Sequence, residues 1–323
     1  MAGGAYYLMQ PQTPEVPTQT YTLTFSSGTS GADWNTAGGS ISNIISTAMP
    51  NVGITNVPGG GITNVLRLNS SQADLGLTYL STLEAGLSGG TLGGVSIVNG
   101  SLPNVKAMLS FATPSAMTVV VRSDIAASSV DELVSKKIAM KWVAFTAGTA
   151  NMMNARVMMS AAFSLTFDDL NKWGGTVSYL PAAQCQQQLQ DGLADGYFGT
   201  NIVGESWIQQ VMTTGKFKIL PLSDAAIQKL TSLGYTSYTL KAGTYTNQNA
   251  DVKTFADLTI LVVRAGLPND LVYYMTKAVV DGRATLALAV RSFTIDTTTM
   301  AKNVQPYLHP GADRYFRDMK YLS

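Results

Sequence analysis

The sequence predicts an α/β protein made of two similar βαβ lobes. Two observations lead to this fold class. The same order of strand, small-residue loop, helix and closing Ala-Asp pair occurs twice, beginning at residue 21 and again at residue 138. Two strands rich in Val, at residues 117–122 and 258–264, lie where the chain would pass between the lobes. The length of 323 residues suits about two domains of roughly 150 residues each.

The first copy begins with a strand at residues 21–25 and continues into a loop of Ser, Gly and Thr at residues 26–31. A helical pattern follows this loop. A second Gly-rich loop at residues 56–64 leads into helical spacing at residues 62–68, and the copy closes on an apolar strand at residues 75–79. Both loops therefore precede helices, and helix N-termini are favourable sites for anions.

The second copy repeats this order. It has a strand at residues 138–142, a loop at residues 145–149, a helix, and an apolar strand at residues 197–200. Because the two lobes match and each has a small-residue loop at a helix start, we predict that they enclose one small ligand between them.

The β-branched runs at residues 117–122 and 258–264 predict buried strands that carry the chain from one lobe to the other and back. Between them, Ser128 or Ser129 is expected to cap a helix. A long helical region is expected over residues 270–289, completing the first lobe.

We therefore expect lobe one to comprise residues 21–115 and 258–323, and lobe two to comprise residues 116–257. Residues 1–20 contain three prolines in their second half and are expected to form an extended leader. A hinge of two strands allows the lobes to close around a ligand.

Composition excludes several classes of protein. Hydrophobic residues make up 46% of the chain, which is ample for a core, and charged residues only 13%. The net charge is +1 and the basic residues do not cluster beyond pairs such as Lys136-Lys137, so nucleic acid is not an expected partner. No apolar run reaches the ~20 residues of a membrane helix. The N-terminus lacks a signal peptide pattern, so the chain is expected to be either cytosolic or the processed form of an exported protein.

Catalytic and metal chemistry are poorly supported by the residue content. His309 is the only histidine, so a nucleophile–histidine pair or a histidine-based metal site would lack a partner. Cys185 is the only cysteine, which rules out an internal disulfide. We expect no metal and no cofactor.

Four stretches carry a resemblance to a known family. Residues 27–34 occupy the place of a Gly-Thr-Gly-Gly-Thr-Tyr-Tyr-like loop, and residues 59–66 match a Gly-Gly-Ser-Val-Glu-Asn-Leu pattern. An Ala-Gly-Thr at 147–149 precedes a helix in a lobe that closes on Ala-Asp-Gly. Residues 308–316 are close to a His-Pro-Gly-Ala-x-Arg-Tyr-Tyr ending. From about Tyr21 to Phe316 the chain resembles the extracytoplasmic solute-binding proteins of TRAP transporters of the TAXI class.

The resemblance implies a periplasmic-binding-protein-like fold of type II and a non-enzymatic receptor. Such a receptor captures a small carboxylate, such as glutamate or 2-oxoglutarate, and delivers it to TRAP transporter membrane subunits. It implies a periplasmic location, with a signal peptide already removed, and we expect a monomer. Asp33-Trp34 replaces the family's usual aromatic pair, which leaves the ligand class open between organic acids and amino acids. The alternative is an enzyme on the same scaffold that uses Asp33 as an acid/base.

The expected ligand contacts lie at the helix-start loops and at strand carboxyl ends, where open α/β sheets bind ligands. Those from lobe one are Ser26, Ser27, Gly28, Thr29, Ser30, Asp33, Trp34, Gly60, Gly61, Asn64 and Tyr79. Those from lobe two are Trp142, Phe145, Thr146, Gly148, Thr149, Thr200 and Asn201.

Several of these residues have two interpretations. Trp34 either stacks on the ligand or is a half-buried residue of its lobe. Asp33 either faces the cleft, where its charge would disfavour an anion, or is a solvated residue of the first helical turn. Thr149 is expected as a ligand donor and also as a helix N-cap. Trp142 or Phe145 is expected to form an apolar wall.

Overall fold

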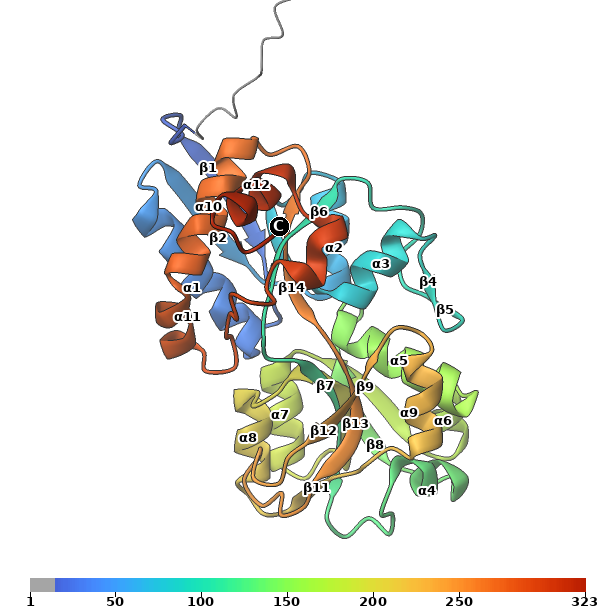
Figure 1. The fold of residues 1–323 in the computed structure, drawn as a ribbon. Helices are drawn as coiled ribbons and strands as arrows, with labels where there is room; N and C mark the ends of the chain where they lie inside the picture. The colour runs from blue at the N-terminus through green and yellow to red at the C-terminus, as the bar shows by residue number, and fades with distance from the viewer. Residues whose placement is uncertain (1–14) are drawn as a thin grey trace, which may run out of the picture.

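Two sheets, each covered by helices, form two lobes that lie one above the other (Figure 1). The computed structural model describes residues 15–323. Most of the expected leader therefore lies outside the described residues, and residues 15–20 contain neither helix nor strand. The α/β fold class with two lobes, predicted from the repeated βαβ pattern, is confirmed.

The first lobe contains a five-stranded sheet in the order β2-β1-β3-β14-β6. β1 is parallel to β2 and β3, whereas β14 is antiparallel to β3 and β6. The strands of this lobe, including a small hairpin, are β1 (Tyr21–Ser26), β2 (Val52–Val57), β3 (Leu75–Tyr79), β4 (Thr91–Leu92), β5 (Val95–Ser96), β6 (Val105–Ser110) and β14 (Thr259–Arg264). Its helices are α1 (Asp33–Ala48), α2 (Gly61–Asn69), α3 (Leu80–Leu87), α10 (Asn269–Asp281), α11 (Arg283–Ala289), the 3₁₀ helix η1 (Lys302–Tyr307) and α12 (Pro310–Asp318).

The second lobe contains a sheet in the order β12-β13-β7-β10-β8-β9, with β11 beside β7. β10, β8 and β9 are parallel, and β7 is antiparallel to β10. Its strands are β7 (Ser115–Arg122), β8 (Lys141–Phe145), β9 (Thr176–Leu180), β10 (Gly196–Ile202), β11 (Phe217–Ile219), β12 (Thr236–Leu240) and β13 (Val252–Asp257). Its helices are α4 (Val130–Ser135), α5 (Ala150–Phe163), α6 (Phe167–Lys172), α7 (Ala182–Gln190), α8 (Ser206–Met212) and α9 (Asp224–Thr231).

The chain passes between the sheets twice. Residues 111–114 connect β6 to β7, and Leu258 alone connects β13 to β14. We propose these two short connections as the boundaries of the lobes, close to the expected ones. α10 and α11 pack against α1, so the C-terminal helices lie on the first lobe (Figure 1).

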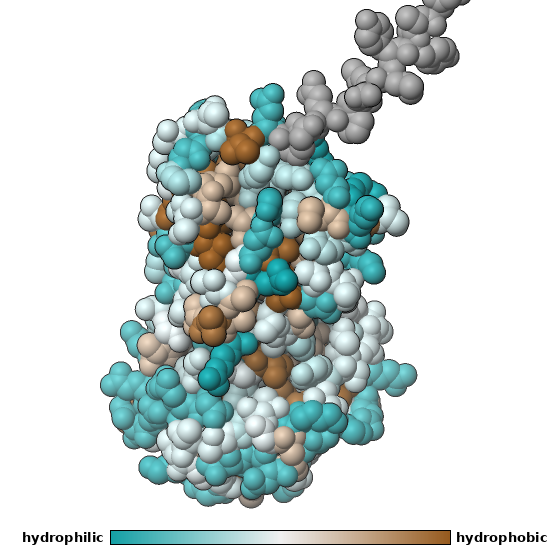
Figure 2. Space-filling view, turned by 60° about the vertical axis from the view of Figure 1, so that its left-hand side comes forward, coloured by the Kyte–Doolittle hydropathy of each residue, from teal (hydrophilic) through white to brown (hydrophobic). Residues whose placement is uncertain are grey.

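The central strands are apolar because both of their faces are covered. All five residues of β3 and all seven of β10 are buried. On the face in Figure 2, hydrophobic residues form small separate groups and the far end of the second lobe is mainly hydrophilic. Within residues 15–323, no helix combines the length and the apolar character needed to cross a membrane.

Two local predictions need correction. The strand expected at residues 138–142 begins three residues later, as β8, because residues before it close α4. Lys137 adopts a left-handed conformation and the amide of Ile138 bonds to the carbonyl of Leu133 at 3.2 Å, which is a Schellman motif. The helical region expected at residues 270–289 is two helices, divided at Gly282. Ser129, not Ser128, caps α4, since its hydroxyl accepts the amide of Glu132.

Candidate functional site

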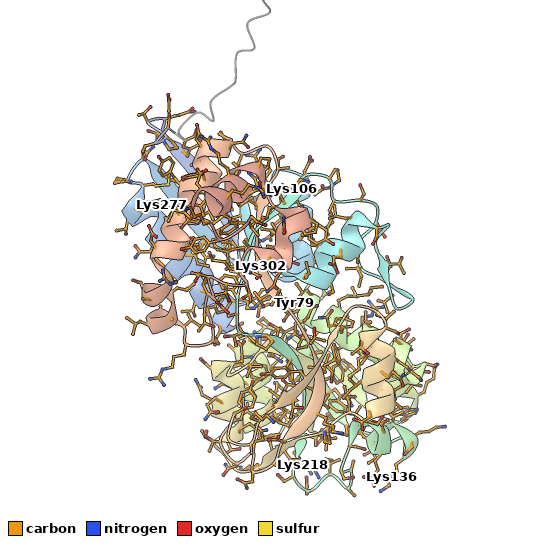
Figure 3. All side chains as sticks on the ribbon, viewed as in Figure 1. Tyr79, Lys106, Lys136, Lys218, Lys277 and Lys302 are labelled. Atoms are coloured by element: carbon orange, nitrogen blue, oxygen red, sulfur yellow. The ribbon has the colours of Figure 1, made fainter. Side chains whose placement is uncertain are left out.

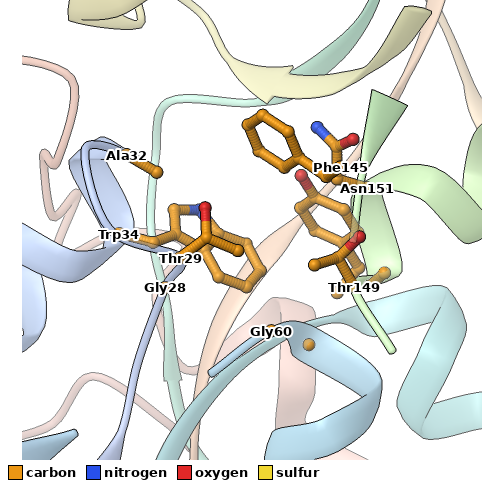
Figure 4. A pocket seen from close by; sticks show the side chains of 11 residues that line it. Gly28, Thr29, Ala32, Trp34, Gly60, Phe145, Thr149 and Asn151 are labelled. Carbon is orange, nitrogen blue, oxygen red and sulfur yellow. The ribbon is translucent and has the colours of Figure 1, made fainter. Parts of the chain in front are cut away.

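A small cavity lies between the two lobes (Figure 4). Its walls come from the helix-start loops of both lobes and from the ends of β3 and β8. The first lobe contributes Gly28, Thr29, Ala32, Trp34, Gly60, Gly61 and Tyr79. The second lobe contributes Phe145, Thr149, Ala150 and Asn151.

Aromatic rings form much of the wall. The rings of Trp34 and Tyr79 meet edge to face, with centroids 5.0 Å apart. In Figure 4, Trp34 comes from the side of α1 and Phe145 from the opposite side, and both rings point into the space between the lobes. Burial raises the pKa of Tyr79, so its hydroxyl stays protonated and donates to the carbonyl of Thr200 at 2.8 Å. This hydrogen bond joins the two lobes, and Figure 3 shows Tyr79 at their junction.

The N-termini of α2 and α5 meet across the lobe junction. A Cβ atom on Gly61 would lie 2.5 Å from the Cβ of Ala150, so only glycine permits this approach. The amide of Thr63 donates to the carbonyl of Gly148 at 2.9 Å. The lobes are therefore in direct contact at the first turns of two helices.

Four amides in these first turns have no hydrogen-bond acceptor among the described residues. First-turn amides have no acceptor within their own helix. Within residues 15–323, no other acceptor is found for the amides of Gly61 and Ile62 in α2, or of Ala150 and Asn151 in α5. Three of these residues line the cavity.

A buried network behind the first-lobe loops shapes them. Asn64 donates to the carbonyls of Ser27 and Leu77 at 2.7 and 2.6 Å, and its side-chain oxygen accepts the amide of Gly60 at 3.0 Å. The hydroxyl of Ser26 donates to the same oxygen at 2.7 Å. Ser26, Ser27 and Asn64 thus hold the Gly-rich loop in place and do not line the cavity.

A second network lies behind the start of α5. The Asn151 amide group donates to the hydroxyl of Tyr197 at 2.9 Å and to the carbonyl of Thr200. The Tyr197 hydroxyl donates to the side-chain oxygen of Asn201 at 3.0 Å. Thr200 and Asn201 therefore support Asn151 from behind.

Thr149 is the N-cap of α5. Its hydroxyl accepts the amide of Met152 at 3.4 Å and donates to the carbonyl of Thr146 at 2.9 Å. The N-cap prediction is confirmed, and both bonds of this hydroxyl are made within the protein. Thr146 and Gly148 contribute backbone carbonyls to this turn and to the lobe junction.

Asp33 lines a second, more open pocket between the lobes, together with Gly204 and Ser206. It is 7% exposed, so it is not a solvated residue, and it does not line the cavity. Its carboxylate accepts the Ser292 hydroxyl at 2.6 Å, and its amide donates to the Glu205 carboxyl group at 2.8 Å. Asp33 is therefore part of a contact between α1 and the start of α8, beside the cavity.

Glu205 is a buried acid that sequence reasoning missed. It is 3% exposed, and burial, followed by the negative charge of Asp33, raises its pKa well above the usual range. The hydrogen bond from the Asp33 amide acts in the opposite direction. The sequence gives no signal for this contact, because the two residues are 172 positions apart.

Other predicted residues are placed as follows. Trp142 packs inside the second lobe, with its ring 4.9 Å from that of Phe198, and lines a separate interior space. We leave it out of the site. Ser30 is exposed, but its carbonyl accepts the amide of Ala183 at 3.3 Å across the lobes. Thr29 lines the cavity and its hydroxyl accepts the amide of Ala182 at 3.5 Å.

Of the predicted residues, the cavity brings together Gly28, Thr29, Trp34, Gly60, Gly61, Tyr79, Phe145 and Thr149. Ala32, Ala150 and Asn151 line it as well but were not predicted. Their position directly at the expected helix starts was a usable signal.

The single histidine has a structural role. The Nδ1 atom of His309 accepts the amide of Gly311 at 3.1 Å, and Nε2 lies 3.2 Å from the carbonyl of Ala265. Burial lowers the pKa of His309, which keeps the ring neutral at the start of α12.

Several solved structures share the fold at low sequence identity. MatC of Rhodopseudomonas palustris with bound malate aligns with a TM-score of 0.57 and 13% identity, over 94% of this chain and 99% of MatC. The R. palustris protein Rpa4515 with adipate aligns with a TM-score of 0.55 and 12% identity, over 95% and 98% of the two chains. The periplasmic binding protein BugD aligns with a TM-score of 0.53 and 14% identity, over 94% of this chain and 99% of BugD. These similarities confirm the predicted periplasmic-binding-protein fold of type II.

A comparison with curated protein sequences finds no match. A family model, in contrast, matches almost the whole described chain. The matched region runs from residue 25 to residue 319 and includes every residue that lines the cavity. The resemblance to TAXI-class solute-binding proteins agrees with this family, to which they are related. By this match, the chain belongs to the NMT1-like family.

Proposed function

We propose that this protein is an extracytoplasmic solute-binding protein. It closes its two lobes on a small carboxylate and delivers the closed complex to TRAP transporter membrane subunits. The observation that carries the proposal is the cavity between the lobes, which is lined by residues from the first turns of α2 and α5. Backbone amides at helix starts bind carboxylates without any basic side chain.

The solved relatives in fold support a carboxylate ligand. MatC was solved with malate and Rpa4515 with adipate, both small carboxylates. Their folds consist of the same two lobes, so a ligand between the lobes is the simplest common arrangement. The short connections at residues 111–114 and at Leu258 suit a hinge.

An enzymatic role for Asp33 gains no support. Its carboxylate is held by Ser292 and it does not line the cavity, so it is poorly placed to exchange a proton with a substrate there. We therefore propose a receptor that acts as a monomer and leaves its ligand chemically unchanged.

The test combines binding with shape. Native mass spectrometry of the purified protein should reveal a retained small carboxylate. After its removal, a carboxylate added at about 100 times its dissociation constant should stabilise the protein by roughly 2.7 kcal/mol. Solution scattering should then show a smaller radius of gyration. Time-dependent conversion of the ligand, or no stabilisation by any carboxylate, would contradict the proposal.

A further inference from the structure

The indole N–H group of Trp34 is a hydrogen-bond donor without a protein acceptor. Trp34 is 9% exposed and lines the cavity between the lobes. Within residues 15–323, its Nε1 atom makes no hydrogen bond. An indole nitrogen can only donate, and a buried donor that lacks an acceptor costs free energy. An acceptor supplied by a ligand would remove that cost.

Two other tryptophans show what distinguishes Trp34. The indole nitrogens of Trp142 and Trp207 also lack an acceptor in the described part of the chain, but the protein buries both of these atoms. The nitrogen of Trp34 is not enclosed in this way. Figure 4 shows the Trp34 ring extending into the space between the lobes, with its nitrogen on the upper edge in this view, towards Ala32 and Phe145. The donor is therefore accessible to a ligand in the cavity.

The surrounding residues fix the position of this donor. A Cβ atom on Gly28 would lie 2.5 Å from the Cβ of Trp34, so only glycine leaves room for the side chain. The Trp34 ring meets Tyr79 edge to face, with ring centroids 5.0 Å apart, and the Tyr79 hydroxyl is itself bound to the carbonyl of Thr200. The indole N–H is therefore held in place before a ligand binds, which lowers the entropic cost of binding.

Most other side-chain donors on the cavity wall are occupied. The hydroxyls of Tyr79 and Thr149 and the amide group of Asn151 donate to groups of the protein. Among the described residues that line the cavity, the remaining side-chain donors are Trp34 and the hydroxyl of Thr29, which accepts a hydrogen bond but is not seen to donate one. Both belong to the first lobe, so a ligand oxygen would be held mainly by that lobe.

We propose that Trp34 determines specificity in this cavity by donating its indole N–H to an oxygen atom of the ligand. This inference rests on the proposed function of the same cavity. It gives Trp34 the role of a ligand donor, whereas the sequence suggested stacking or plain packing. A site built to donate a hydrogen bond discriminates strongly against an analogue that lacks the acceptor.

Nuclear magnetic resonance of the indole N–H groups tests the inference directly. The chain has four tryptophans, so isotope-labelled protein should give four indole signals, which single Trp→Phe variants assign. The probes are malate, adipate, glutamate and 2-oxoglutarate, each added in excess to the ligand-free full chain. For every probe that binds in calorimetry, the Trp34 proton signal should move downfield, and further than the signals of Trp142 and Trp207.

Trp34→Phe adds a measurement of affinity. It removes the N–H and keeps an aromatic ring, and it should weaken a probe that binds the wild type by about tenfold or more, the usual cost of losing a hydrogen bond to a charged group. Trp142→Phe is the matched control, because it removes an N–H that lies inside the second lobe. Its affinity should equal that of the wild type.

The outcomes separate this inference from the proposed function. If a probe binds without moving the Trp34 signal, or binds Trp34→Phe as tightly as the wild type, the role of Trp34 is overturned while a carboxylate receptor remains. An equal loss of affinity in Trp142→Phe would also overturn it, since the loss would then come from packing. If none of the four probes binds, the inference and the proposed carboxylate ligand are both overturned.

Discussion

Thr149 shows how a residue expected to bind ligand can instead organise the backbone that does. Its hydroxyl bonds to the amide of Met152 and the carbonyl of Thr146. Thr149→Val removes the cap and keeps the shape. It should lower the free energy of unfolding by about 1 kcal/mol, the usual cost of losing an N-cap. Urea unfolding of the ligand-free protein measures this value.

Thr149→Ser is the matched control, because it keeps the hydroxyl and should retain most of the stability. If the valine and serine variants unfold at the same urea concentration, the cap contributes nothing. If valine lowers ligand affinity without any loss of stability, Thr149 acts as a ligand donor, as the sequence first suggested.

Tyr79 joins the lobes through one hydrogen bond to the carbonyl of Thr200. Tyr79→Phe removes that bond and keeps the ring beside Trp34. A buried neutral hydrogen bond contributes about 1 kcal/mol, so ligand affinity should fall about fivefold. Calorimetry measures this change.

Tyr235→Phe is a suitable control for Tyr79→Phe. The Tyr235 hydroxyl bonds to Asn154 at 2.8 Å, and both residues belong to the second lobe. This variant should lower stability and leave affinity unchanged. An equal loss of affinity in both variants would indicate a general loss of packing rather than a bond made on closure.

At the scale of elements, the close approach of α2 and α5 depends on Gly61. Gly61→Ala would place a Cβ atom 2.5 Å from that of Ala150 when the lobes are closed. In an open form with the lobes apart, this contact would be absent. The variant should therefore fold normally. It should bind ligand on the order of tenfold more weakly, because overpacking costs about 1–3 kcal/mol. At a ligand concentration that saturates the wild type, its radius of gyration should stay larger than that of the wild type.

Gly39→Ala is the matched control. Gly39 also lies in a helix, but a Cβ there would be 3.7 Å from its nearest neighbour, an ordinary contact. Its affinity should equal that of the wild type. Unchanged affinity in Gly61→Ala would mean that ligand binding does not require the helix starts to meet.

The elements were largely predictable because their signals are local. The strands at residues 21–25 and 75–79 and the helix starts after each small-residue loop follow from periodicity and from cap residues. The predicted strand began three residues before β8, because residues 136–138 close α4 with a left-handed turn at Lys137. Residue propensity does not reveal where α4 ends. That shift also explains Trp142: it lies near the start of β8, inside the lobe, while Phe145 lies at its carboxyl end beside the cavity.

Contacts across the chain could not be predicted in this way. Asn151 follows the expected loop by two residues, but its partners Tyr197 and Thr200 lie about fifty positions away. The burial of Asp33 depends on Glu205 and Ser292, which come from the second lobe and from the segment after α11. A single sequence does not show which distant acid a helix start will meet.

At the scale of the whole molecule, the contact between the two lobes buries an acid. Glu205 belongs to the second lobe and bonds to the amide of Asp33 on the first, so the contact exists only while the lobes are together. The groups that face it are Asp33, Ser292 and Tyr245, whose hydroxyl accepts the amide of Gly204. Burial raises the pKa of Tyr245, with Glu205 adding to the shift, so this hydroxyl remains neutral.

The raised pKa of Glu205 makes closure depend on pH. In the open form Glu205 regains water, so its pKa should return towards the ordinary value near 4.3. The closed form then holds more protons than the open form above that pH. By linkage, the contribution of Glu205 to the stability of the closed form is fully present below its ordinary pKa. This contribution is lost as pH rises through the raised pKa. Ligand affinity should therefore fall between pH 5.5 and 8, by up to about tenfold per pH unit.

Glu205→Gln tests this dependence, because glutamine keeps an oxygen that can accept the Asp33 amide but has no proton to lose. Its affinity, measured by calorimetry with the same ligand, should be nearly constant over the same range, in which a simple ligand carboxylate is already ionised. It should exceed that of the wild type most clearly at pH 8, where the buried Glu205 is hardest to keep neutral. Parallel profiles for wild type and Glu205→Gln would mean that Glu205 does not titrate on closure. A profile that rises with pH in the wild type alone would show that the ionised form is favoured, reversing the sign argued from burial and from the charge of Asp33.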